Sequence, residues 1–272
     1  MNDRLRWVIP LPLLIFVASA WIFVRTENEV RVQIERAQNQ WRTENYREAV
    51  EIYESVHQDY PKSQYADDAL WEVGTVYYVN LYDVDRALIS FHKLVTQYPD
   101  SPLAAESYLK LAQIHEVELA DLPQAIACWN QLLSLDLPLE RRRQVHFYIG
   151  NAHFKLNQFE KALGEFEFLM NGGQVDDLTD RSRAQAGTIM QIQNRYEESL
   201  EYFNEVLEKT NCSDCRRTAR LGLIESYEFL GQLSMAMEVA QTIPTSEFST
   251  QAKEDLLKRL DEKARYYNPG GQ

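Results

Sequence analysis

The chain has 272 residues, of which 45% are hydrophobic and 25% are charged, and its formal net charge is −13. It contains only 10 glycines and 9 prolines, which argues against a strand-rich fold with many tight turns and favours long helices. The acidic balance argues against a nucleic-acid-binding surface, because such a surface needs clustered lysine and arginine. It fits solubility or, alternatively, attraction to basic partners. Three cysteines are too few for a disulfide-stapled scaffold, so packing must supply the core.

An uncharged segment, residues 7–24, follows a short N-terminal tail, residues 1–6. As a helix, its 18 residues would be about 27 Å long, close to the hydrocarbon thickness of a bilayer. We expect a transmembrane signal-anchor, with the short tail in the cytoplasm and the large C-terminal body across the membrane. A signal peptide cleaved after Ala20 is the alternative, because residues 18–20 (Ala-Ser-Ala) have the form of a cleavage site. Residues 25–30 would be a junction or an extension of the first helix.

The rest of the chain contains one pattern that occurs six times. A small residue recurs at intervals of 37 or 38 residues, and a mostly aromatic residue follows four positions later, on the same helix face. The small residues are Ala49, Ala87, Ala125, Ala162, Ser199 and Ala236, and their followers are Tyr53, Phe91, Trp129, Phe166, Phe203 and Ala240. A second series lies 12 or 13 residues upstream and comprises Ala37, Gly74, Ala112, Gly150 and Gly187, with Ile224 in the sixth copy.

Each copy is therefore interpreted as two amphipathic helices whose small residues allow close packing. Neither helix can bury its apolar face alone, so the copies are expected to stack. We predict an all-α, helix-turn-helix solenoid of about six repeats, at residues 31–63, 64–101, 102–138, 139–175, 176–212 and 213–245. A polar-faced helix within residues 246–267 would cap the array, and residues 268–272 would form a disordered tail.

The motifs within these copies resemble those of the tetratricopeptide repeat family. The family's Leu-Gly-x-x-Tyr motif is similar to residues 73–77 (Val-Gly-Thr-Val-Tyr), and its Ala-x-x-x-Phe motif matches residues 87–91. The resemblance covers roughly residues 31–245. Linkers of the form Tyr-Pro-x-Ser-x-x-Ala, at residues 60–66 and 98–104, resemble those of bacterial cell-envelope members of the family. Examples of such members are the lipoprotein of the outer-membrane assembly machine and the Tol–Pal-associated repeat protein.

The resemblance implies a concave groove, lined by the first helices of successive repeats, that holds an extended peptide or a partner helix. The residues at groove positions are Trp71, Thr75, Tyr78, Gln113, Phe147, Asn151, Phe154, Lys155, Gln185 and Thr188. Aromatic rings would supply contact area, and amides would pair with a peptide backbone. Trp71, Tyr78 and Phe147 could alternatively pack against neighbouring helices. Asn151 and Lys155 resemble part of the carboxylate clamp of some family members, although the matching Lys and Asn are absent from the adjacent copies.

Cys212 and Cys215 form the one motif that suggests reactivity, a Cys-x-x-Cys in the turn between the fifth and sixth copies. We expect a local disulfide or idle thiols here, and thiol–disulfide exchange and metal binding are the alternatives. A zinc site would need further ligands, and the nearest histidine, His153, is 59 residues away. The sequence has no recognisable catalytic order of side chains and no Gly-rich phosphate loop. We therefore expect no enzymatic activity, no cofactor and no metal.

Together these features predict a membrane-anchored scaffold that binds a protein partner or a peptide in its groove. The predicted location is the bacterial inner membrane, crossed once, with the body in the periplasm as part of an envelope complex. Neither nucleic acid nor a small-molecule substrate is expected as a ligand. The alternative is a permanent structural subunit of a membrane complex, held by its anchor helix and convex surface, with no peptide ligand.

Overall fold

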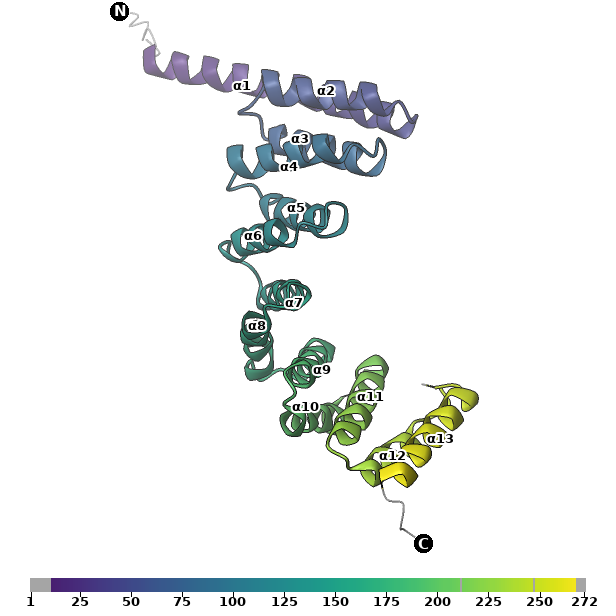
Figure 1. Ribbon diagram of the computed structural model, residues 1–272. Coiled ribbons are helices and arrows are strands. Elements are labelled where there is room, and N and C mark those ends of the chain that lie inside the picture. Colours follow the sequence, from purple (N-terminus) through teal and green to yellow (C-terminus); the bar gives the residue numbers. More distant parts are fainter. Residues whose placement is uncertain (1–10, 211, 247, 268–272) are drawn as a thin grey trace, which may run out of the picture. The chain divides into compact units, whose positions relative to one another are not determined.

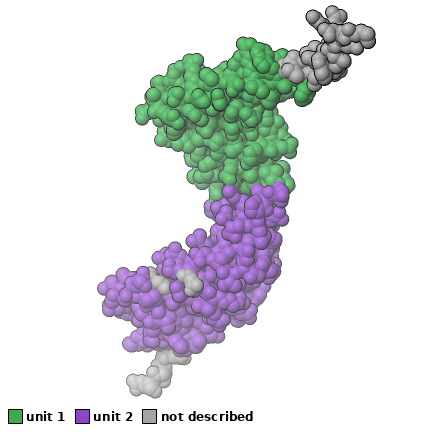
Figure 2. All heavy atoms as spheres, turned by 180° about the vertical axis from the view of Figure 1, so that it is seen from behind, with its two compact units in different colours: residues 1–135 green, residues 136–272 purple. Residues whose placement is uncertain are grey.

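The computed structural model describes residues 11–210, 212–246 and 248–267. These ranges contain thirteen α-helices and no strand, which confirms the all-α class predicted from the sequence. The chain divides into two compact units, unit 1 (residues 1–135) and unit 2 (residues 136–272), which are coloured separately in Figure 2.

Unit 1 consists of three helix pairs. Its helices are α1 (Leu11–Arg42), α2 (Tyr46–Asp59), α3 (Ala66–Val79), α4 (Val84–Gln97), α5 (Ala104–Val117) and α6 (Leu122–Leu133). The two helices of a pair run antiparallel, and consecutive pairs contact each other through α2 with α3 and through α4 with α5 (Figure 1). Aspartates set the starts of two second helices, since the side chain of Asp83 accepts the backbone N–H of Arg86 and that of Asp121 accepts the N–H of Gln124.

Unit 2 consists of three further helix pairs and one terminal helix. Its helices are α7 (Leu139–Lys155), α8 (Phe159–Asn171), α9 (Asp177–Ile192), α10 (Tyr196–Lys209), α11 (Ser213–Phe229), α12 (Leu233–Thr242) and α13 (Thr250–Tyr267). The pairs contact each other through α8 with α9 and through α10 with α11, and α13 packs against α12. Leu260 of α13 is fully buried beside Ile224, Ala240 and Ile243. The last helix therefore covers an apolar surface that α11 and α12 would otherwise expose.

Close contacts between phenylalanine rings and small residues hold the pairs together. A Cβ atom added to Gly74 would lie 2.7 Å from the ring of Phe91, and one added to Gly150 would lie 2.7 Å from the ring of Phe166. Phe203 is approached from two helices, because Cβ atoms added to residues 187 and 222 would lie 2.8 and 2.4 Å from its ring. These three phenylalanines are fully buried. The small-residue and aromatic series of the sequence thus meet as a close-packed interface between helices.

The turns inside the pairs repeat with the same period. Each contains one residue with positive φ, at Glu44, Tyr82, Ala120, Asn157, Asn194 and Gly231, spaced 38, 38, 37, 37 and 37 residues apart. A left-handed residue after a helix satisfies the last carbonyl groups and reverses the chain. Asparagine and glycine, used in unit 2, adopt this conformation readily, whereas glutamate, tyrosine and alanine, used in unit 1, do so at a conformational cost.

The first helix is continuous over 32 residues, from Leu11 to Arg42, and includes residues 25–30 without a break. Along the ranges given above, we find no helix with the length and apolar character that a membrane crossing requires. The expected anchor at residues 7–24 begins outside the described residues, and so does the expected N-terminal tail. The expected C-terminal tail also lies outside them.

Candidate functional site

The first helices of the pairs in unit 2 are linked to one another by hydrogen bonds from amide side chains. Gln185 of α9 donates an N–H to the side-chain oxygen of Asn151 of α7, at 3.2 Å. Gln191 of α9 donates to the backbone carbonyl of Gly222 and to the hydroxyl of Ser226 in α11, both at 2.8 Å. We call Asn151, Gln185 and Gln191 the amide array. Its polar contacts connect three consecutive first helices, α7 with α9 and α9 with α11.

A cleft of about 340 Å³ lies on two of these helices, α7 and α9, near the start of each. It is lined by Glu140, Gln144, Asp176, Asp177, Leu178 and Arg181. Gln144 precedes Asn151 by seven residues on α7, and Arg181 precedes Gln185 by four residues on α9. Spacings of seven and four place these residues on the helix faces that carry Asn151 and Gln185 of the amide array. We call the cleft and the amide array together the first-helix face of unit 2.

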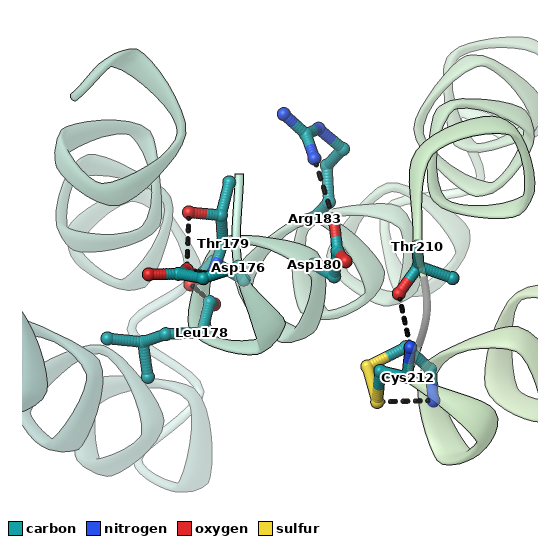
Figure 3. Close-up of a disulfide and its surroundings, with 9 residues drawn as sticks. Asp176, Leu178, Thr179, Asp180, Arg183, Thr210 and Cys212 are labelled. Carbon is teal, nitrogen blue, oxygen red and sulfur yellow. Dashed lines mark hydrogen bonds and ion pairs between the residues drawn. A yellow bond between two sulfur atoms is a disulfide. The ribbon is translucent and has the colours of Figure 1, made fainter. Parts of the chain in front are cut away.

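A buried arginine fixes the start of α9 beside this cleft. Arg143 is almost fully buried in α7 and donates both terminal nitrogens to the carboxylate of Asp176, one of them at 3.0 Å, and also bonds the hydroxyl of Thr179 at 2.8 Å. Asp176 in turn accepts the backbone N–H of Thr179 at 2.9 Å and so caps α9 (Figure 3). The hydrogen bonds from Arg143 hold the pKa of Asp176 well below its usual range. The start of α9 is therefore fixed to α7 by a buried charged group.

Two of the aromatic residues predicted to line a groove pack against their own helix pair. The ring of Phe147 lies 6.1 Å from that of Phe166 in α8, and the ring of Phe154 lies 5.9 Å from that of Phe159. Both belong to the margin of the buried cluster around Phe166. Lys155, at the end of α7, is exposed. The first-helix face of unit 2 is consequently more polar than the sequence suggested.

The predicted groove residues of unit 1 lie on α3 and α5. Trp71 is half-buried, with its ring 5.3 Å from that of Phe91 in α4. Tyr78 donates its hydroxyl to Glu118 at 3.1 Å, and burial together with this bond raises the pKa of Tyr78. The other two predicted groove residues of unit 1, Thr75 and Gln113, differ in burial. The hydroxyl oxygen of Thr75 is buried and has no hydrogen-bond partner among the described residues, whereas Gln113 is exposed.

Thr188 is half-buried on α9 and returns its hydroxyl to the carbonyl of Ala184 at 3.0 Å. Among the predicted groove residues, Asn151 and Gln185 are joined by a direct hydrogen bond between side chains of neighbouring first helices. Sequence reasoning missed Gln144 and Arg181. Their spacing of seven and four residues from that pair was the signal that could have found them.

Cys212 and Cys215 form a disulfide at the start of α11, with their Cα atoms 5.2 Å apart. Both are buried, in a cluster that includes Phe203 and Leu223. Cys212 is the N-cap of α11, since its sulfur accepts the backbone N–H of Cys215, and its own N–H donates to Thr210 (Figure 3). Burial in an apolar cluster suits a structural role. No group of His, Cys, Asp and Glu side chains in the described ranges is arranged to hold a metal ion.

Comparison with known proteins agrees with this architecture. Residues 33–63 and 68–101 match one tetratricopeptide repeat profile, and residues 109–167 match a second, so the chain contains tetratricopeptide repeats. No curated protein matches the chain in sequence.

Three solved structures share the fold at low sequence identity. A tetratricopeptide repeat protein from Parabacteroides merdae ATCC 43184 is 15% identical, with 88% of this chain and 93% of that chain covered and a TM-score of 0.54. YrrB, described as a TPR protein with an unusual peptide-binding site, is 15% identical over 79% of this chain and 97% of its own, with a TM-score of 0.52. PilW, described as a widely conserved type IV pilus biogenesis factor, is 16% identical over 85% and 97%, with a TM-score of 0.51.

Proposed function

We propose that this chain of tetratricopeptide repeats is a membrane-anchored scaffold that binds an extended peptide or a helix of a partner protein on its first helices. The observation that carries the proposal is the first-helix face of unit 2, where an amide array adjoins a cleft of about 340 Å³. Tetratricopeptide repeats suit protein or peptide partners, and a peptide-binding site is named for YrrB, which shares the fold.

The chemistry of the amide array supports an extended peptide as the ligand. Each amide side chain offers two donors and a carbonyl oxygen with two lone pairs. Asn151 and Gln185 use one donor and one acceptor on each other, so further donors and acceptors are available for peptide N–H and C=O groups. The adjacent cleft offers both signs of charge, from Arg181 and Asp177. Such a surface recognises a peptide backbone with little demand on its side chains.

The start of α1 supports membrane anchoring. Phe16, Trp21, Ile22, Phe23 and Val24 are each more than half exposed, so unit 1 does not bury this apolar segment. Large exposed apolar surfaces are typical of protein or membrane contacts. The proposed anchor is residues 7–24, and the proposed location is the bacterial inner membrane with the body in the periplasm. A disulfide in unit 2 fits an oxidising compartment of this kind.

Site-specific photo-crosslinking tests the binding face. A photo-reactive phenylalanine analogue at the exposed Arg181 position should yield a crosslinked partner in native membranes, identified by mass spectrometry. The same analogue at Asn204, an exposed residue of the second helix α10, is the matched control and should yield none. Crosslinks at position 204 alone would instead favour a permanent subunit held through its convex surface.

Two alanine variants then test the amide array. Asn151→Ala and Gln185→Ala should each weaken the crosslinked partner's affinity about fivefold, the effect of losing one hydrogen bond worth about 1 kcal/mol. The control Asn204→Ala removes an amide elsewhere and should leave affinity unchanged. Equal affinity of all three variants and the unmodified protein would remove the amide array from the binding site.

Membrane fractionation tests the anchor separately. The full-length protein should remain with the membranes after alkaline carbonate extraction, and a variant lacking residues 1–24 should be released as a soluble body. Recovery of the full-length protein in the soluble fraction would contradict anchoring without affecting the peptide-binding proposal.

A further inference from the structure

The turns between the paired helices of unit 1 form an exposed apolar edge. The α1–α2, α3–α4 and α5–α6 turns lie along the same side of this unit (Figure 1). These turns and the helix ends that precede them display five large apolar residues that are between 46% and 82% exposed: Trp41, Val79, Tyr82, Val117 and Leu119. We call these five residues the turn edge. None of them belongs to the first-helix face of unit 2.

Hydrogen bonds between neighbouring turns fix the turn edge in place. The indole N–H of Trp41, at the end of α1, donates to the side-chain oxygen of Asn80, just after α3, at 3.1 Å. The hydroxyl of Tyr78, at the end of α3, donates to Glu118, just after α5, at 3.1 Å. The three helix ends are therefore held side by side as a preformed surface. A preformed surface loses little conformational freedom when a partner binds.

Tyr82 is the least expected residue of the turn edge. It has φ of +54°, a left-handed conformation that is unfavourable for a bulky side chain. Its side chain is 82% exposed, so its ring contributes little packing in return. The corresponding turns of unit 2 use Asn157, Asn194 and Gly231, which tolerate this conformation. Glu44 and Ala120 share the conformation in the other turns of unit 1, but Tyr82 is the one of the three with a large aromatic ring. Backbone strain of this kind is concentrated at functional sites.

The charges around the turn edge define the partner that fits it. The segments 41–48, 79–86 and 116–121 contain seven acidic and three basic residues, a net charge of −4. Between the first two turns lies a cleft of about 430 Å³, whose lining includes Leu81, the carboxylates of Glu44 and Glu48 and one basic residue, Arg47, so its charge remains negative. A lysine or arginine side chain placed beside such an apolar surface would meet complementary charge.

We propose that the turn edge of unit 1 docks an amphipathic helix of a partner protein, with basic residues flanking its apolar stripe. A line of apolar residues from three consecutive turns matches the stripe that one helix presents at positions i, i+3, i+4 and i+7. Anionic lipid and a second copy of this chain fit less well, because both would bring negative charge to an acidic edge.

The first test compares two defined probes on the full-length protein. Both are synthetic, fluorescein-labelled peptides of about 18 residues with leucines at identical helical positions, about five turns long. One carries lysine on its polar face and the other carries glutamate. Fluorescence anisotropy at about 0.15 M salt should show binding of the lysine peptide and binding at least tenfold weaker for the glutamate peptide. Equal affinity for both peptides would overturn the proposed charge complementarity.

Tyr82→Asn locates the binding surface without disrupting the fold. Asparagine tolerates positive φ, so the variant should be at least as heat-stable as the unmodified protein. It lacks the exposed ring, so its affinity for the lysine peptide should fall about tenfold or more, as expected for an aromatic anchor. Unchanged affinity in this variant would remove Tyr82 from any docking surface.

Two control variants distinguish the loss of the Tyr82 ring from the backbone change and from the loss of any exposed apolar side chain. Ala120→Asn makes the same backbone change in the next turn without losing a ring, and Ile192→Asn removes an exposed apolar side chain from unit 2. Both should bind the lysine peptide as the unmodified protein does. A loss of affinity in Ile192→Asn equal to that in Tyr82→Asn would show nonspecific capture of the peptide and overturn the proposal.

Two further measurements address the other occupants. Analytical ultracentrifugation that shows a dimer dissociated by Tyr82→Asn would assign the edge to a second copy. Binding to phosphatidylglycerol vesicles that this variant abolishes, with residues 1–24 removed in both proteins, would assign it to lipid. Either result would overturn the partner-helix proposal. Gln185→Ala serves as the reference for the first-helix face and should leave affinity for the lysine peptide unchanged.

Discussion

A single methyl group at Gly222 should destabilise unit 2. The glycine lies in α11 against the ring of Phe203, and an added Cβ atom would lie 2.4 Å from two atoms of that ring. Carbon atoms attract best at about 3.5–4.0 Å, so this distance is strongly repulsive. The ring has little room to move away, because it is fully buried and also packs closely against Gly187 of α9, where an added Cβ would lie only 2.8 Å away.

The magnitude follows from two opposing effects. Replacing glycine by alanine inside a helix stabilises the helix by about 1 kcal/mol. Overpacking a filled core costs about 1–3 kcal/mol or somewhat more, and a ring enclosed from two sides lies at the upper end. The net effect of Gly222→Ala should therefore be a loss of about 2 kcal/mol in the free energy of unfolding. With a urea dependence of about 2 kcal/mol/M, the unfolding midpoint would fall by about 1 M.

Gly164→Ala is the matched control. It lies inside α8 of the same unit, and an added Cβ would meet no atom within 4 Å. This variant should gain about 1 kcal/mol, the helix-propensity effect alone. Urea unfolding followed by far-ultraviolet circular dichroism measures both variants. If Gly222→Ala proved as stable as Gly164→Ala, the Phe203 ring would leave room for a methyl group at position 222, and the overpacking argument would be wrong.

Two further predictions concern charges and sulfur in unit 2. Arg143→Met should lower stability at pH 7 by about 1–3 kcal/mol, nearer the lower figure because the carboxylate of Asp176 is partly exposed and screened. The pKa of Asp176 is depressed in the folded state. The stability that its pairing with Arg143 contributes is therefore fully present above the usual aspartate pKa of about 4, and it is lost as the pH falls through the pKa of Asp176 in the folded protein. The difference in urea midpoint between the variant and the unmodified protein should therefore narrow below about pH 4, and a difference independent of pH would contradict this pairing. Reduction of the disulfide between Cys212 and Cys215 should cost about 1–2 kcal/mol, the chain-entropy value for so short a loop. Cys212→Ala should lose about 1 kcal/mol more than Cys212→Ser, because serine still caps α11, and equal thermal midpoints for the two would argue against the cap.

The all-α fold could be predicted from sequence because its determinants are local and periodic. A small residue at a fixed place in each helix, such as Gly74, leaves space that only a large ring such as Phe91 fills. Both residues recur at intervals of 37 or 38, so the pattern is visible without knowledge of the tertiary contacts. The positive-φ turns follow the same interval but were not predicted, since residues such as Tyr82 and Ala120 give no signal for that conformation.

The surface chemistry could be predicted only in part, because it depends on side-chain partners from neighbouring helices. Position within the repeat placed Phe147 and Phe154 on a first helix, but it did not reveal that their rings pack against α8. Likewise, it did not reveal that Gln185 bonds Asn151 across helices. A buried arginine such as Arg143 was also not foreseen, since its burial depends on a carboxylate 33 residues away. Such pairings depend on rotamers and distances that helix periodicity does not encode.

The turn residues with positive φ differ in conformational cost between the two units, which gives an independent reason to assign a binding role to the turns of unit 1. A residue in the left-handed conformation costs about 1–2 kcal/mol unless it is glycine or a short polar residue. Unit 2 avoids this cost with Asn157, Asn194 and Gly231, whereas unit 1 incurs it, most clearly at Tyr82. Stability alone would favour asparagine or glycine at position 82. Glu44 and Ala120 carry the same cost in unit 1, but Tyr82 is the one of these three turn residues with a large aromatic side chain, and it is 82% exposed, so its ring contributes something other than stability. Contact with a partner is the role that an exposed aromatic ring on a fixed turn can fill.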